Sequence, residues 1–239
     1  MKKEESKVEV KTNQSQENEK KIDGSTYRKV ENKKHKTGIT IKRFILIVLF
    51  VVVILGLIIG IRWRMLYNIQ QNYNYSIASD NWHYYSDSDT TIMNVYKKGS
   101  IWKMNTKQKN GEGNLTFWRD LSTNEAYVFY EEPLKKYSED KSKTIINLPS
   151  SGLYTEEENT RLLMAATPTL WIGLEKYDGI NCYVIGIENH KEYIDQSTGL
   201  LLATFDDNKQ TRSVEYEFGK VTDEDVAKPD VSEYEYLEQ

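Results

Sequence analysis

The sequence predicts a mainly β (α+β) fold that is preceded by a disordered tail and one transmembrane helix. Residues 44–61 form an 18-residue run without a charged or strongly polar side chain. The remaining chain contains short β-type segments separated by turn residues, and one interrupting segment with a helical pattern. We therefore expect five parts: a basic tail (1–38), a transmembrane signal anchor (39–64), a stalk (65–81), a β domain (82–230) and an acidic C-terminal tail (231–239).

Charge is distributed unevenly along the 239 residues. Residues 1–43 hold 13 basic and 7 acidic residues, and residues 62–239 hold 19 basic and 29 acidic ones. The net charge of −4 is therefore the sum of a +6 part and a −10 part. Such a chain is not a uniformly basic nucleic-acid binder, and no nucleic-acid partner is expected.

The tail over residues 1–38 is rich in Lys, Glu, Asn, Gln and Ser. It offers too little apolar surface to offset the entropy of ordering, so disorder is predicted. Its basic end, residues 33–36, has two interpretations. It either contacts anionic lipid headgroups or is a solvated segment that only sets topology.

Residues 44–61 predict a membrane-spanning helix. At about 1.5 Å per residue the run is about 27 Å long, close to the roughly 30 Å hydrocarbon core of a bilayer. It is longer than the apolar part of a cleaved signal peptide, and no small-x-small cleavage site follows it. An uncleaved signal anchor over residues 39–64 is the expectation.

Basic residues predict the orientation of this anchor. Six Lys and Arg residues lie in the 15 positions before the run and two in the 15 after it. The positive-inside rule then places the N-terminus in the cytoplasm and the C-terminal domain outside the plasma membrane. The residues assigned to the membrane anchor are Lys42, Arg43, Arg62 and Trp63.

The first half of the domain predicts hairpins. Residues 65–81 continue the anchor either as a stalk or as an opening helix. Short turns link two strand pairs, and Pro133 precedes a short edge strand. The expected strands are residues 91–96, 100–104, 114–120, 125–130 and 135–137.

One helix is expected over residues 155–166. A capping box from Thr155 to Glu158 starts it, an apolar run follows, and Pro168 stops it. Because its C-terminal half is apolar on all sides, we expect that half to be enclosed against a sheet.

The last third predicts a continuing meander. Asp178-Gly179, a strong hairpin signal, separates two strands, and residues 214–218 alternate between apolar and polar. The acidic end, residues 223–239, is expected to fray. Strands joined by short turns indicate an antiparallel meander with one inserted helix. These strands are residues 171–177, 180–187, 190–195, 200–205 and 214–218.

Two motifs in this region resemble those of LolA-like proteins, a superfamily of outer-membrane lipoprotein carriers and RseB-type sensors. A G-x-x-x-Y-x-I strand starts at Gly179, and a strand ending in D-x-x-T-G follows at Asp195. The resemblance covers residues 75–230 and implies an unclosed antiparallel β-barrel whose concave apolar face receives acyl chains or lipoproteins. Unlike the soluble carriers, this chain keeps an anchor, and no binding residue of the family transfers to it.

Catalytic signals are weak. Cys182, the one cysteine, lies in a predicted strand and is expected to be a buried thiol. Cys182 and His190 could form a nucleophile–base pair only in principle, because no third catalytic group accompanies them. Asp87 and Asp89 fall in a polar run that predicts a loop. No metal-ligand spacing or phosphate-binding loop occurs, so neither a metal nor a cofactor is expected, and the protein is predicted not to be an enzyme.

Aromatic and apolar side chains either fill a core or line an apolar groove, and the sequence leaves both alternatives open. The groove candidates are Trp102, Trp118, Phe129, Leu162, Leu163, Met164 and Trp171.

Two functional hypotheses follow. The first is a membrane-anchored, non-catalytic binding protein for a lipid, a lipoprotein or an envelope protein. The alternative is a bitopic assembly subunit of an envelope complex of the secretion, conjugation or division type.

Overall fold

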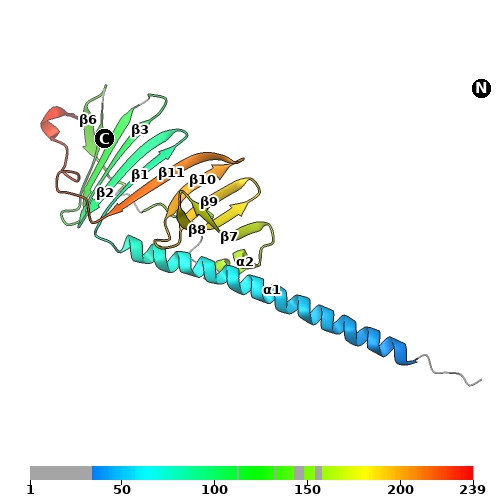
Figure 1. The fold of residues 1–239 in the computed structure, drawn as a ribbon. Helices are drawn as coiled ribbons and strands as arrows, with labels where there is room; N and C mark the ends of the chain where they lie inside the picture. The colour runs from blue at the N-terminus through cyan, green and yellow to red at the C-terminus, as the bar shows by residue number, and fades with distance from the viewer. Residues whose placement is uncertain (1–33, 112, 132, 143–147, 154–157, 239) are drawn as a thin grey trace, which may run out of the picture. The chain divides into compact units, whose positions relative to one another are not determined.

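The computed structural model describes residues 34–111, 113–131, 133–142, 148–153 and 158–238 (Figure 1). The chain divides into two units, residues 1–48 and 49–239. In the first unit the described residues are the start of helix α1, Lys34–Ile77. The predicted disorder of residues 1–33 and the predicted cap at residues 155–157 lie outside the described residues.

Helix α1 is the one helix among the described residues that is long and apolar enough to cross a membrane. It begins five residues before the predicted anchor and runs without a break to Ile77. In its last part Leu66, Ile69 and Tyr73 are buried, whereas Tyr75 is 84% exposed. The 3–4 residue spacing puts the buried residues on one helical face. Residues 65–77 are therefore an opening helix packed on the domain, and not a free stalk.

The second unit is built on one twelve-stranded sheet with the strand order β12-β6-β5-β4-β3-β2-β1-β11-β10-β9-β8-β7. A short helix, α2 (Glu158–Ala166), lies between β6 and β7 in the chain, and a 3₁₀ turn, η1 (Val231–Glu233), precedes β12. The strands are β1 Asn81–Ser88, β2 Thr91–Lys98, β3 Ile101–Gln108, β4 Asn114–Asp120, β5 Glu125–Tyr130, β6 Lys136–Glu139, β7 Leu170–Tyr177, β8 Ile180–Ile187, β9 His190–Asp195, β10 Leu201–Asp206, β11 Lys209–Phe218 and β12 Glu235–Tyr236.

Two antiparallel meanders, β1–β6 and β7–β11, join where β1 pairs with β11 along its length. The outermost strands, β12 and β7, do not pair with each other, so the sheet is unclosed. The predicted mainly β, mostly antiparallel unclosed sheet with a short helix is confirmed. Asp178 and Gly179 have φ values of 48° and 80°, as a tight hairpin turn of the primed type requires.

Two predictions for the ends of the domain are wrong. Asp87, which was predicted to lie in a loop, belongs to strand β1, whose buried Trp82 and Tyr84 alternate with half-buried neighbours. The acidic C-terminal end does not fray over the described residues, because Glu235–Tyr236 adds a parallel strand to β6.

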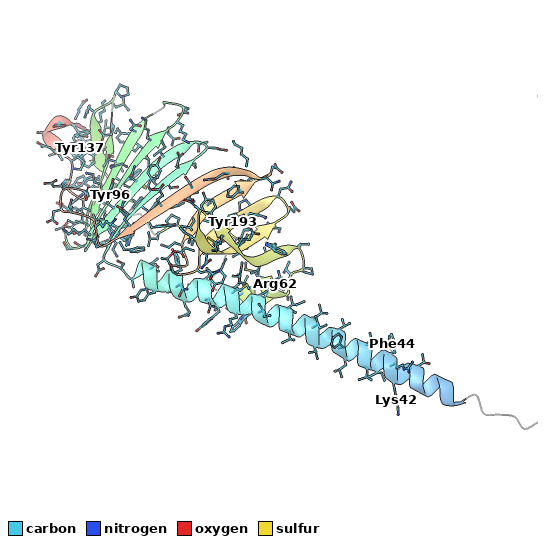
Figure 2. The ribbon with its side chains drawn as sticks, viewed as in Figure 1. Lys42, Phe44, Arg62, Tyr96, Tyr137 and Tyr193 are labelled. Carbon is cyan, nitrogen blue, oxygen red and sulfur yellow. The ribbon has the colours of Figure 1, made fainter. Side chains whose placement is uncertain are left out.

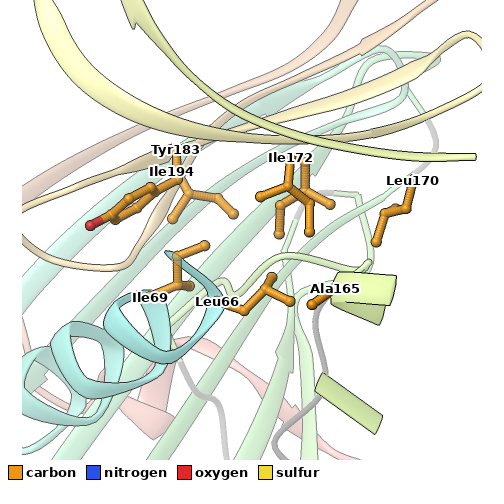
Figure 3. Close-up of a cluster of buried hydrophobic side chains, with 8 residues drawn as sticks. Leu66, Ile69, Ala165, Leu170, Ile172, Tyr183 and Ile194 are labelled. Carbon is orange, nitrogen blue, oxygen red and sulfur yellow. The ribbon is translucent and has the colours of Figure 1, made fainter. Parts of the chain in front are cut away.

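The core has two clusters of buried side chains along α1. Figure 3 shows the first, in which Leu66 and Ile69 of α1 face Ile172 and Ile194 of the sheet. The second joins Tyr73 to Trp82, Trp102 and neighbouring strand residues, and the Tyr73 hydroxyl donates to the Leu148 carbonyl at 2.9 Å. The last turns of helix α1 therefore belong to the core of the domain.

Helix α2 covers the sheet only with its inner face. Ala165 is fully buried in the first cluster and Met164 packs against it. Leu162 and Leu163 are 55% and 68% exposed, so the expectation that the apolar half is enclosed is wrong for these two residues.

Gly199 brings the β9–β10 turn against α1. Its φ is +70°, and a Cβ at this position would lie 2.4 Å from both the Ile69 carbonyl oxygen and the Tyr73 amide nitrogen. Gly179 has a similar φ of +80° but no heavy atom within 4 Å of a Cβ. The two glycines differ mainly in the contact with α1.

We expect Gly199→Ala to destabilise the domain by more than Gly179→Ala. The control variant, Gly179→Ala, carries only the backbone strain of a non-glycine residue at positive φ, about 1 kcal/mol. In Gly199→Ala the new methyl group must also push the β9–β10 turn away from α1. Urea unfolding of the full chain in detergent, followed by tryptophan fluorescence, measures both. Equal losses would show that the helix–turn contact does not hold the domain together.

Candidate functional site

Three predicted groove residues are buried in the first meander. Trp102 belongs to the second core cluster, where its ring meets that of Trp82 edge to face at 5.2 Å. Trp118 and Phe129 lie under the C-terminal segment; the Trp118 indole N–H donates to the Val226 carbonyl at 2.9 Å. These three side chains fill packed interiors.

The other four candidates lie around α2 and β7. Leu162, Leu163 and Met164 are on α2, and only Met164 contacts the core. Trp171 is 58% exposed, and its indole lies over Gly173, where a Cβ would be 3.1 Å from the ring. The structure therefore separates the seven candidates into two groups at different places in the sheet.

An apolar groove lies between α1 and the start of β7. Its volume is about 490 Å³. Helix α1 contributes Ile58, Ile61, Arg62 and Met65, and the segment from Pro168 to Ile172 forms the other wall. Trp171 is the one predicted groove residue that lines it. The sequence gives no periodic signal for this groove, because its walls come from segments more than a hundred residues apart.

Arg62 provides the charge in the groove. One of its terminal nitrogens donates to the backbone carbonyls of Thr167, at 2.9 Å, and Leu170. These bonds hold the α2–β7 connection to α1, on which Figure 2 labels Arg62. Its Nε is buried without a hydrogen-bond partner, and no carboxylate of the described residues pairs with Arg62. The guanidinium is therefore a positive charge without a counterion at an apolar wall.

The remaining predicted anchor residues also lie on α1. Lys42 and Arg43 are exposed near its start, as Figure 2 shows for Lys42. Trp63 packs against the first core cluster and stacks on Tyr67 with ring centroids 5.5 Å apart. Trp63 thus contacts both Tyr67 on its own helix and the core of the domain.

The weak catalytic candidates are kept apart. Strand register pairs Cys182 with Asp195 and His190 with Ile187, so the two lie at opposite ends of the β8–β9 pair. Burial raises the pKa of the Cys182 thiol. Asp87 and Asp89 each pair with a lysine, and Asp87 lies in β1, not in the predicted loop. Among the described residues no three His, Cys, Asp or Glu side chains are grouped to hold a metal.

A buried carboxylate fixes the loop before α2. Glu192, 4% exposed, accepts hydrogen bonds from the Ser151 hydroxyl, the Gly152 amide at 2.9 Å and the Leu153 amide at 3.3 Å. His190 Nε2 lies 3.5 Å from Glu192 Oε1, and His190 Nδ1 lies 2.6 Å from an Asp206 oxygen. Sequence reasoning missed this cluster, because its members are recognisable only once β9, β10 and the loop meet.

No family model matches the sequence, and no curated protein matches it. Among solved structures the chain is similar to PNGF-II in two crystal forms, at 9% identity and TM-scores of 0.31 and 0.28. These matches cover 67% and 66% of this chain but only 32% and 30% of PNGF-II. A DUF1329 family protein from Desulfovibrio piger matches at 10% identity over 70% of this chain and 95% of its own, with a TM-score of 0.23. These similarities are too distant to carry a statement about function.

We expect the stability of the domain to depend on the protonation of His190. Burial lowers its pKa, but the hydrogen bonds to Asp206 and Glu192 outweigh that effect, so its pKa is raised above 6.5. The stabilisation that protonated His190 gives through Asp206 and Glu192 is therefore complete below pH 6.5. It is lost as the pH rises through the higher pKa that His190 has in the folded state. Because His190 is partly exposed, the loss is about 1 kcal/mol or less.

Urea unfolding across this range checks the effect, with His190→Gln as the matched variant that cannot titrate. The wild-type chain should lose stability relative to the variant as the pH rises. Parallel pH profiles of the two proteins would contradict the role of His190.

Proposed function

We propose that this chain is a single-pass membrane protein whose non-catalytic domain, on the outer side of the plasma membrane, binds an acyl chain of a membrane lipid or lipoprotein. The observation that carries the proposal is the apolar groove between α1 and β7. Ile58 and Ile61, which line it, belong to the last turn of the apolar run of residues 44–61. The groove therefore starts where the hydrocarbon core of a bilayer would end.

The dimensions and lining of the groove suit an acyl chain. Its volume of about 490 Å³ falls in the range of ligand pockets, roughly 300–1,000 Å³. Isoleucine, leucine, methionine and tryptophan side chains form the walls, and the one charge is that of Arg62. A lipid with a negative headgroup would bring a counterion to this guanidinium while its chain stays among apolar side chains.

The rigid link between helix and domain supports the same proposal. Leu66 and Ile69 are buried in the domain only a few residues after the apolar run, and the helix between them is continuous. If the run spans a membrane, β7 therefore stays close to the membrane surface. Exposed apolar side chains at this end, Leu162, Leu163 and Trp171, suit that environment. The resemblance of the sequence to LolA-like proteins, which accept acyl chains, agrees with such a ligand.

Photocrosslinking tests the groove. The full chain is reconstituted into vesicles that contain a phosphatidylglycerol with a diazirine on its acyl chain. We expect labelling of residues 168–172 besides the membrane-spanning residues, loss of that labelling in Thr169→Trp, which fills the groove, and its retention in Leu174→Trp. Leu174 is 57% exposed on β7 but does not line the groove. Labelling confined to the membrane-spanning residues would refute the groove as a lipid site.

A cysteine-accessibility experiment tests the orientation. Cys182 is buried and is the one cysteine of the chain, so Cys182→Ala gives a background without thiols. Thr123→Cys then places a thiol in the exposed β4–β5 turn. A membrane-impermeant maleimide should label it on intact cells. Labelling only after the cells are lysed would reverse the proposed topology.

A further inference from the structure

A second cavity lies on the first meander, at a distance from the apolar groove in the fold, and shares no lining residue with it. We call it the polar cleft. Its volume is about 520 Å³, and it lies between the face of strands β2–β4 and the chain that follows β11. Its polar lining includes Asn94, Lys103, Asn105, Thr116, Glu131 and Tyr234.

The floor of the polar cleft is a row of polar side chains across three strands. Asn94 pairs with Asn105, and Asn105 pairs with Thr116, so the three point to the same face. Asn94 Oδ1 lies 3.2 Å from a nitrogen of His83, and Asn105 Oδ1 lies 3.0 Å from the Thr116 hydroxyl. Among the described residues no hydrogen bond engages the side-chain nitrogen of Asn94 or Asn105. Both amides therefore have donors free for a ligand.

The C-terminal segment forms a wall of the cleft. The Tyr234 hydroxyl donates to Glu131 at 2.9 Å, and the Thr116 hydroxyl lies 3.0 Å from the other Glu131 oxygen. The Tyr234 ring meets Phe129 edge to face at 5.1 Å. These contacts fix a carboxylate and a phenol beside the row of amides, and they leave an aromatic ring near the cavity.

Lys103 supplies a positive charge that forms no ion pair with the described residues. It is half-buried, and its register partners on the neighbouring strands are Tyr96 and Trp118, neither of which is charged. No carboxylate of the described residues lies within ion-pair distance of its ammonium group. Desolvation lowers the pKa of Lys103, although Asp225 and Glu131 partly offset this. An anionic group of a ligand would therefore meet a poorly solvated cation that Asp225 and Glu131 influence only from beyond ion-pair distance.

We propose that the polar cleft binds an acidic saccharide, with the sugar hydroxyls on the amides of Asn94 and Asn105 and its carboxylate or phosphate on Lys103. Sugar hydroxyls both donate and accept, as do amide and hydroxyl side chains. A peptide strand would instead bind an exposed sheet edge through its main chain. Strands β2, β3 and β4 have hydrogen-bonded neighbours on both sides, so only side chains are available for recognition here.

Titration calorimetry on the full chain tests this, in lauryldimethylamine oxide micelles, since a maltoside detergent would itself present sugar. The probes are trigalacturonate and glucose 6-phosphate for the two kinds of acidic group, maltotriose as a neutral sugar, and a hexaglutamate peptide. We expect at least one acidic sugar to bind, and Lys103→Gln to weaken it about tenfold, in keeping with a lost charged hydrogen bond. Asn105→Ala should weaken it as well. Lys176→Gln removes an exposed charge on β7 and should leave binding unchanged.

The outcomes separate the alternatives. Binding of neither acidic sugar at millimolar concentration would overturn the proposal, as would equal affinity for maltotriose. Tighter binding of hexaglutamate would make the cleft a peptide site, and insensitivity to both Lys103→Gln and Asn105→Ala would place the ligand elsewhere. None of these results depends on whether the apolar groove binds lipid.

Discussion

The packing of the last turns of α1 against the sheet is the contact on which the rest of the molecule depends. Leu66 is fully buried and Ile69 is 2% exposed, and both project from a helix whose residues 40–58 are exposed. Burying such side chains contributes roughly 1.5–3 kcal/mol each before entropic costs. The helix extends from the apolar run into the core without a flexible spacer. Residues 66–77 are therefore part of the domain and not a linker to it.

The same packing creates the apolar groove. Because α1 lies across the start of β7, the last apolar turn of the helix comes to face Leu170 and Ile172. The Arg62 guanidinium donates hydrogen bonds to the carbonyls of Thr167 and Leu170, which follow α2, and so holds them against α1. Before α2 in the chain, the buried Glu192 carboxylate accepts hydrogen bonds from the Ser151 hydroxyl and from the backbone amides of Gly152 and Leu153. The connection between the two meanders is thus held on both sides of α2 in the chain: Arg62 donates hydrogen bonds to the residues after α2, and Glu192 accepts them from the residues before it.

The C-terminal segment packs on the first meander, as α1 packs on both meanders. It lies over Trp118 and Phe129, adds a strand to β6, and places Lys228 over the Tyr127 ring at 3.8 Å. By covering apolar side chains on the face that α1 does not reach, it also forms a wall of the polar cleft. Its acidic composition gave no indication of this packing, since composition reports average solubility and not the position of Tyr234 or Val226.

The sequence by itself determined the single candidate span, the mainly β class and most of the hairpins. Unbroken apolar runs and tight-turn residues such as Asp178-Gly179 determine structure locally, so they can be recognised without knowing which distant segment of the chain they contact. Only the tertiary structure decided which aromatic residues are buried, that residues 65–77 pack on the sheet, and where the two cavities lie. Leu66 touches strands more than a hundred residues later, and Asn94, Asn105 and Thr116 align only once strand register is set. Register and helix docking depend on contacts between distant segments, which no local pattern in the sequence records.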